Sequence, residues 1–287
     1  MSDSTSPLVL RRRLRTELRT ARLERQLTQD QVAKAMDWSL SKMNRIEKAK
    51  SGISVNDLKV LLMLYGITDR ERIEELIALA RTARHRTWWS GYSDVAPAEL
   101  LELMDFESAA SAVSQFEIIT VPRILQTEEY AWAVMHGLYG ESSAAERVAP
   151  LVELHTKSRD LLTSEDAPIF SFVLDESIIH RQVGSPAVIS QQLMHLVQLA
   201  QLPNVTIRIA PFTIGLHPGM NGPFEVVQFE DAPDENIVFL NGPRGDFIID
   251  DSTETEGYLS AFRRIVERSL GPSESLGRLR QVAQEIV

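Results

Sequence analysis

A short polar segment near the N-terminus has residue types that suit hydrogen bonding to DNA. It contains Ser39, Leu40, Ser41, Lys42, Asn44 and Arg45. Asn can make paired hydrogen bonds to the edge of adenine, and Arg can make them to guanine. Because the major groove of DNA accepts one α-helix, these side chains can reach base edges if they lie on the outward face of a helix.

The surrounding sequence predicts five short helices between Leu14 and about Arg86. Thr28 and Gln31 have the spacing of a capping box, which satisfies backbone N–H groups at the start of a helix. Ser39 is a suitable N-cap for the next helix, and further capping boxes begin at Ser54 and Thr68. These signals, with apolar residues at helical spacing, predict a compact α-helical bundle.

Residues 28–47 form the candidate helix-turn-helix of this bundle. Asp37 and Trp38 interrupt the helical pattern, so one helix follows another after a short turn. Such helices cross steeply where small residues meet, and Ala33 meets that need. The second helix would then carry the polar segment into the major groove. An α-hairpin with a charged, solvated face is the alternative interpretation.

The phrases LTQDQVAKAM (27–36) and SLSKMNRIEKAKSGIS (39–54) give this region a family resemblance. Residues 14–67 resemble the lambda-repressor-like (Xre-type) helix-turn-helix domain. The resemblance implies that Gln29 bonds a phosphate or a base edge, and that Glu47 pairs structurally with Arg22. The positions it implies for reading bases are Ser39, Leu40, Ser41 and Arg45. Leu40 departs from the polar residues common there, so it contacts either a thymine methyl or nothing.

Charge is distributed unevenly along the chain. Residues 1–90 carry 18 Lys and Arg against 11 Asp and Glu, a net charge of +7, although the whole chain has −10. Salt screens charges beyond about 10 Å, so DNA responds to the local field and a basic region can bind it. The run at residues 11–13, three arginines, is interpreted as an arm contacting the minor groove or phosphates, or as a solvated tail.

The composition argues against several kinds of site. The chain has no cysteine, which excludes disulfides and thiolate metal ligands. No apolar run approaches the roughly 20 residues of a membrane span, and the first residues lack a signal peptide, so we expect a cytoplasmic protein. The six histidines lack metal-site spacing, and no phosphate-binding glycine loop occurs. We therefore expect no metal, no cofactor and no catalysis.

The remaining sequence predicts an α+β domain. The expected division is a disordered tail at 1–9, the helix-turn-helix domain at 10–86, a linker at 87–97 and the α+β domain at 98–287. Helices are expected near 98–116, 127–138, 144–163, 186–201, 256–270 and 274–286. Strands are expected at 169–174, 205–210, 224–230, 237–240 and 246–249. Short connections after residue 224 predict an antiparallel meander in a small mixed or antiparallel sheet.

Further phrases extend the resemblance through the C-terminal region: LMDFESAAS (103–111), VPRILQTEEYA (121–131) and the stretch at 202–229. They are similar to a group of actinomycete Xre-type regulators, sometimes called antitoxin-like. The group usually has Gly where this chain has Arg123. Its C-terminal domain has no assigned function, and its members are often encoded beside a small partner protein.

Aromatic and polar residues of the second region give a candidate ligand site. Trp88 and Trp89 are expected to pack a domain interface or to stack on a ligand. The loop at 211–223, rich in Gly, Pro and His, is expected to be a structural turn, or to bind a ligand through His217 or Asn221. Tyr130 and Phe212 could add aromatic walls.

These observations predict a sequence-specific DNA-binding regulator. We expect a homodimer on palindromic double-stranded DNA, with the C-terminal domain mediating dimerisation and receiving a small molecule or a small protein as signal. The alternative is an antitoxin-like protein whose main role is to bind a small partner protein, with autoregulatory DNA binding.

Overall fold

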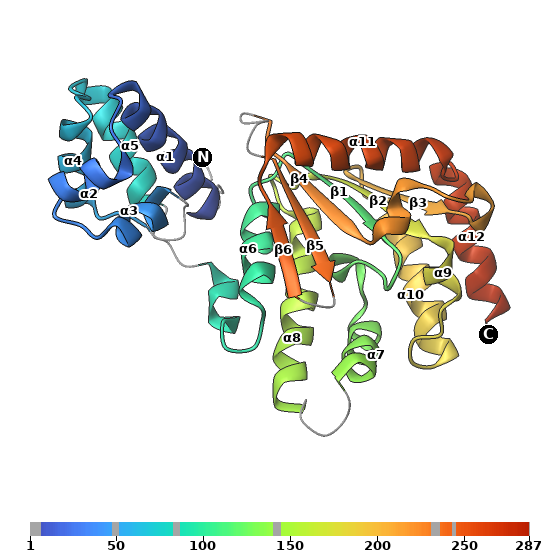
Figure 1. Ribbon diagram of the computed structural model, residues 1–287. Helices are drawn as coiled ribbons and strands as arrows, with labels where there is room; N and C mark the ends of the chain where they lie inside the picture. Colours follow the sequence, from blue (N-terminus) through green and yellow to red (C-terminus); the bar gives the residue numbers. More distant parts are fainter. Residues whose placement is uncertain are drawn as a thin grey trace. The chain divides into compact units, whose positions relative to one another are not determined.

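The computed structural model describes residues 7–47, 52–82, 87–139, 145–230, 236–242 and 245–286. The chain forms two compact units, and the boundary falls between Ser90 and Gly91 (Figure 1). The first unit is helical and the second is an α+β structure, as the sequence predicts. Each unit is described by itself.

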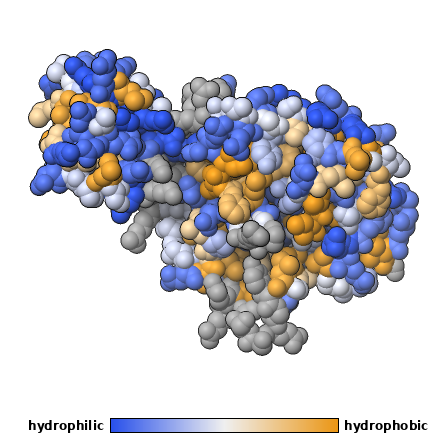
Figure 2. All heavy atoms as spheres, in the orientation of Figure 1, coloured by the Kyte–Doolittle hydropathy of each residue, from blue (hydrophilic) through white to orange (hydrophobic). Residues whose placement is uncertain are grey.

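The first unit is a bundle of five helices. They are α1 (Pro7–Glu24), α2 (Gln29–Ala35), α3 (Leu40–Glu47), α4 (Val55–Leu64) and α5 (Arg70–Thr82). Each contributes apolar side chains to one core, including Leu18, Val32, Met43, Leu62 and Leu76. On the face seen in Figure 2, hydrophilic residues cover most of this unit. The predicted capping box at Thr28 is confirmed, and Ser54 caps α4.

The N-terminal end of α1 differs from the expectation. The helix begins at Pro7, inside the range expected to be a disordered tail, and residues 1–6 lie outside the described part of the chain. The three arginines at 11–13 lie within α1, so interpreting them as a solvated tail is wrong, whereas their contact with DNA stays a prediction. Their apolar neighbours Leu10 and Leu14 are buried, which explains why the helix continues through the basic run.

The second unit is built around a six-stranded mixed sheet in the order β3-β2-β1-β4-β5-β6. The strands are β1 (Ala112–Glu117), β2 (Ile169–Asp175), β3 (Val205–Ala210), β4 (Phe224–Gln228), β5 (Ile237–Gly242) and β6 (Gly245–Ile249). β1, β2 and β3 run parallel, whereas β4, β5 and β6 form the predicted antiparallel meander. β4 joins the two halves by pairing antiparallel with β1.

Helices cover both faces of this sheet (Figure 1). They are α6 (Ala98–Glu107), α7 (Glu128–Tyr139), α8 (Ala145–Ser158), α9 (Glu176–His180), α10 (Pro186–Leu199), α11 (Ser252–Arg268) and α12 (Pro272–Glu285). On one face α11 packs Leu259, Phe262 and Ile265 against the sheet residues Phe116 and Val226. In Figure 1, α6, α7, α8 and α10 lie on the opposite side. Asp251 caps α11 by accepting hydrogen bonds from two backbone N–H groups.

One sequence-based prediction for this unit is wrong in an instructive way. The helix expected at 98–116 ends at Glu107, and residues 112–117 are strand β1. Residues 114–117 alternate buried Ser114 and Phe116 with half-buried Gln115 and Glu117, which is a strand pattern. Helical spacing in residues 98–107 masked this alternation. As a strand, β1 pairs with β4, which is buried on both faces because helices cover both sides of the sheet (Figure 1).

Candidate nucleic-acid interface and ligand cavity

The candidate DNA-reading helix α3 is fixed to its bundle by a buried ion pair. Arg22 on α1 donates hydrogen bonds to both carboxylate oxygens of Glu47, from Nε at 2.6 Å and Nη2 at 3.0 Å. Its Nη1 donates to the backbone carbonyl of Leu27 at 2.7 Å. Glu47 holds the pKa of Arg22 above its ordinary value, chiefly through these hydrogen bonds. The resemblance implied this pair, and it joins the end of α3 to α1.

Gln29 at the start of α2 takes part in the same network. Its Nε2 donates a hydrogen bond of 2.6 Å to Glu47 Oε2. The turn that follows α2 depends on Asp37, whose φ of 55° lies in the left-handed region; Asp tolerates this region better than most residues. Trp38 N–H then donates to Ala33 O at 2.8 Å. Together these contacts set the direction in which α3 leaves α2.

The outward face of α3 carries most of the residues expected to contact DNA. Ser39, Leu40, Ser41 and Arg45 are exposed, and Asn44 is half-buried. Met43 and Ile46 are buried in the bundle core on the opposite face. Lys42 is engaged elsewhere, because its Nζ lies 3.1 Å from Asp57 Oδ2 and 4.1 Å from the centre of the Trp38 ring. α3 therefore presents a short, exposed surface with Arg45 as its cation.

The residues expected to form a ligand site are not among those that line the cavity of the second unit. Tyr130 is buried and accepts a hydrogen bond from Val121 N–H, whereas Phe212 and Asn221 are exposed. His217 is buried against the ring of Phe116. Trp88 and Trp89 pack edge to face on each other in a 3-10 helix at 88–92. None of these six residues lines the cavity described next.

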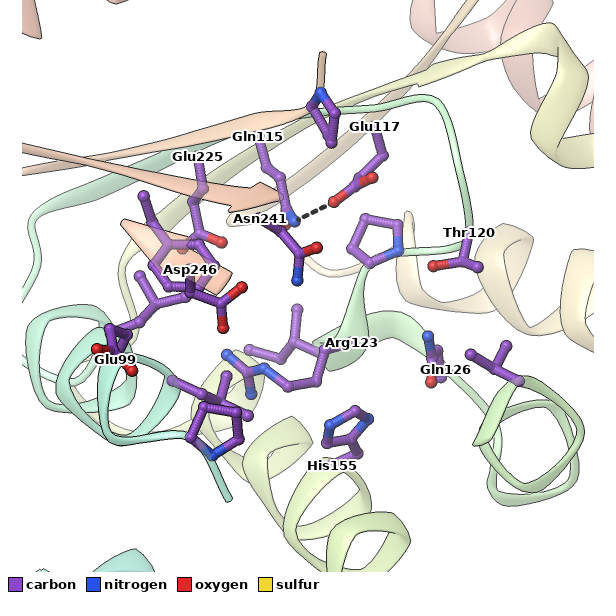
Figure 3. Close-up of a pocket in the computed structure, with 18 of the residues that line it drawn as sticks. Glu99, Gln115, Glu117, Thr120, Arg123, Gln126, His155, Glu225, Asn241 and Asp246 are labelled. Carbon is purple, nitrogen blue, oxygen red and sulfur yellow. Dashed lines mark hydrogen bonds between the residues drawn. The ribbon is translucent and has the colours of Figure 1, made fainter. Parts of the chain in front are cut away.

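A cavity of about 430 Å³ lies in the second unit, beside the sheet face opposite α11 (Figure 3). Its polar lining consists of Glu99, Glu107, Gln115, Glu117, Thr120, Arg123, Gln126, His155, Glu225, Asn241 and Asp246. Five of them lie on strands and face the cavity, because side chains two apart on a strand share a face: Gln115, Glu117, Glu225, Asn241 and Asp246. Gln115 pairs with Glu225 across β1 and β4, and Asn241 pairs with Asp246 across β5 and β6.

Helical segments complete the cavity. α6 supplies Glu107, whose buried carboxylate forms an ion pair with Arg123 from the 3-10 helix at 123–125. α8 supplies His155, which burial and the charge of Arg123 keep neutral by lowering its pKa to about 3. Apolar walls come from α6, α7 and α8, including Leu100, Leu103, Val134, Met135 and Leu151. Sequence reasoning missed this site because residues 98–116, which include Gln115, were predicted as one helix and no strand was expected there.

Two family comparisons agree with this division of the chain. Residues 13–76 match a family described as a helix-turn-helix domain. Residues 100–281, more than half of the chain, match a family described as a domain of unknown function, DUF5753. The protein belongs to this DUF5753 family and carries a helix-turn-helix domain in front of it, which indicates a DNA-binding regulator. Searches of curated proteins and of solved structures gave no match.

The helices of the described residues were also compared with the requirements of a membrane span. None of them combines the length and hydrophobicity that crossing a membrane requires.

Proposed function

We propose that the protein is a transcription regulator, not an enzyme, that recognises a specific DNA sequence through the outer face of α3. The observation that carries this proposal is the exposure of the residues expected to read bases, on a helix that a buried ion pair fixes to its bundle. Arg45 would bond a guanine edge, and Ser39 and Ser41 would bond bases or phosphates. The proposal includes membership of the Xre-type, lambda-repressor-like group and a place in the cytoplasm.

The regulator would act as a homodimer. Two copies of α3 would enter successive major grooves of a palindromic site, with half-sites about one helical turn apart. The second unit would mediate dimerisation and receive the signal, and its cavity supports this role because it is large enough for a small molecule. Signal binding would change the spacing of the two helix-turn-helix units through differential affinity for two arrangements.

A specific surface feature favours the second candidate, an antitoxin-like role in binding a small partner protein. Phe212, Leu216 and Met220 project from the loop at 211–223 with 62%, 85% and 59% of their surface exposed. Apolar side chains gathered on a surface are typical of protein contacts. DNA binding would then be autoregulatory, in line with the antitoxin-like resemblance.

Selection from random double-stranded DNA tests the DNA-reading proposal. The full chain is expected to enrich a palindrome with half-sites about one turn apart, and light scattering is expected to show a dimer. Arg45→Ala should lose preference at one base of each half-site. Arg70→Ala is the matched control, since it removes an exposed cation from α5. Enrichment of no sequence, or the same sequence with Arg45→Ala, would refute the assigned role of α3.

The same DNA can separate the two candidate roles. A protein encoded beside this one, added during the titration, should change DNA affinity if the antitoxin-like role holds. Leu216→Ser should abolish that change. An unchanged affinity would assign signal reception to the cavity.

A further inference from the structure

The cavity of the second unit is lined by more carboxyl groups than its own cationic residue can pair with. Five carboxyl groups line it, whereas the described lining residues include one arginine and no lysine. That arginine, Arg123, is already paired with Glu107. Glu99, Glu117, Glu225 and Asp246 are left without a cationic partner in the lining. Glu99 is exposed, but ionising the buried members of this cluster together costs free energy in the empty protein, because buried like charges repel.

Burial and neighbouring charges raise the pKa values of three of these carboxyl groups. Burial raises the pKa of Glu117 to about 7. Burial, followed by the charge of Glu107, raises the pKa of Glu225 well above its ordinary value. Burial and the charge of Glu99 likewise raise the pKa of Asp246. These groups therefore tend to hold protons when the cavity is empty.

Buried polar atoms of the same cavity also lack partners. Within the described part of the chain, four such atoms that line it make no hydrogen bond: Glu225 Oε1, Gln126 Oε1, His155 Nδ1 and Arg123 Nη1. Glu225, Gln126 and His155 are each more than nine-tenths buried. Unsatisfied buried groups are costly, and several around one cavity indicate that a bound molecule satisfies them.

The lining favours an organic molecule over a metal ion. No group of three His, Asp or Glu among the described residues is arranged to hold a metal ion. Apolar side chains from α6, α7 and α8 face the same space, including Leu103, Met135 and Leu151. A bare cation would leave this apolar wall uncovered, whereas an organic body would cover it. An anion would be repelled by those carboxyl groups that are ionised, and it would not favour the ionisation of the others.

We propose that the cavity binds a small organic cation, an ammonium group carried on a partly apolar body. The ammonium group would lie between Glu225 and Glu117, which stand on neighbouring strands (Figure 3). Gln115, already donating to Glu117 at 3.2 Å, would position that carboxylate. The body would rest against the α6–α8 wall, and Arg123 Nη1 would donate to an oxygen of the ligand. That this ligand is the signal of a regulator rests on the proposed function, whereas its binding to the cavity does not depend on that function.

Binding a cation would release protons. The ammonium group favours the ionised forms of Glu225 and Glu117, so both carboxyl groups would pass protons to the buffer as the ligand enters. Affinity should therefore rise as the pH increases from about 6 to about 8, because fewer protons then need to be displaced. A typical amine stays protonated over this range.

The test uses two sets of compounds that differ in charge on a constant body. One set is tryptamine, tryptophol and indole-3-acetate, and the other is 2-phenylethylamine, 2-phenylethanol and phenylacetate. The full chain, without DNA, is titrated with each compound by calorimetry in two buffers of different ionisation enthalpy. Glu225→Gln keeps the shape of the side chain and removes its charge. Glu267→Gln, an exposed position on α11, is the matched control.

Tryptamine or 2-phenylethylamine is expected to bind about tenfold or more tightly than the matching alcohol. Heats that differ between the two buffers would report the proton release. Glu225→Gln should reduce amine affinity about tenfold, whereas Glu267→Gln should leave it unchanged. The proposal is overturned if neither amine binds in the millimolar range, if the alcohol or acid binds as tightly, or if Glu225→Gln binds like the wild type. Failure here with intact DNA selection would spare the proposed regulator role.

Discussion

The face of α3 and the cavity of the second unit are built from opposite kinds of sequence information. The α3 face comes from one helix of eight residues, which an ion pair to α1 and the buried Met43 and Ile46 hold in place. The cavity gathers side chains from α6, β1, α8, β4, β5 and β6, spread over residues 97–246. A local site is exposed and nearly complete in one segment, whereas a dispersed site exists only after the sheet has formed. The two sites should therefore fail independently.

The largest expected effect concerns the ion pair under α3. Glu47→Ala leaves the Arg22 guanidinium buried without its carboxylate, which typically costs about 3–5 kcal/mol. We expect this variant to destabilise the first unit and to leave the second folded. Hydrogen exchange on the full chain, read separately for α1–α5 and for the sheet, measures both.

Asp30→Ala is the control for that variant. It removes an exposed carboxylate whose pair with Lys34 spans one helical turn, and such pairs contribute only about 0.3–0.5 kcal/mol. If Glu47→Ala exchanged no faster than Asp30→Ala, the pair would not fix α3. Faster exchange throughout the sheet would contradict the independence of the two units.

The cavity should make the second unit sensitive to pH. Glu117 and Glu225 hold protons in the folded state that the unfolded chain has released, so their contribution to stability is lost as the pH rises through the raised pKa values, about 7 for Glu117. His155 acts oppositely, because its pKa is lowered and its contribution is lost as the pH falls below its ordinary value.

We therefore expect these carboxyl groups to make the second unit lose stability as the pH rises from 4.5, the ordinary carboxyl pKa, through about 7. Chemical unfolding at a series of pH values measures this, and Glu117→Gln should reduce the loss between about pH 6 and pH 8 by about 1 kcal/mol. A pH profile of Glu117→Gln identical to that of the wild type would contradict the assignment of this loss to Glu117.

The sequence-based predictions succeed and fail along the same division. Capping residues such as Thr28, and the spacing of Met43 and Ile46, are local signals, so the helical unit and the candidate α3 face follow from them. The meander after Phe224 is equally local, since its connections are short. The cavity could not be predicted, because it needs the pairing of Gln115 with Glu225, more than a hundred residues apart. Reading residues 98–116 as one helix removed even the local evidence for β1.

The smallest expected effect sharpens the description of α3. Lys42 lies on the candidate DNA-binding segment, but its ammonium contacts Asp57 and Trp38. We expect Lys42→Ala to cost about 0.5–1 kcal/mol of stability and to weaken DNA binding far less than Arg45→Ala. Thermal unfolding and DNA titration of both variants provide the comparison. Equal losses of DNA affinity would mean that Lys42 leaves Asp57 to contact DNA.

The most direct test of the division between the sites is one DNA titration with three proteins. Labelled DNA carrying the selected sequence is titrated with the full chain, Arg45→Ala and Glu225→Gln, without any ligand. Losing a bidentate base contact costs about 1–3 kcal/mol, so Arg45→Ala should bind about tenfold or more weakly. Glu225→Gln should bind within about twofold of the wild type, because each site fails independently. Unchanged binding by Arg45→Ala, or an equal loss in Glu225→Gln, would contradict the account.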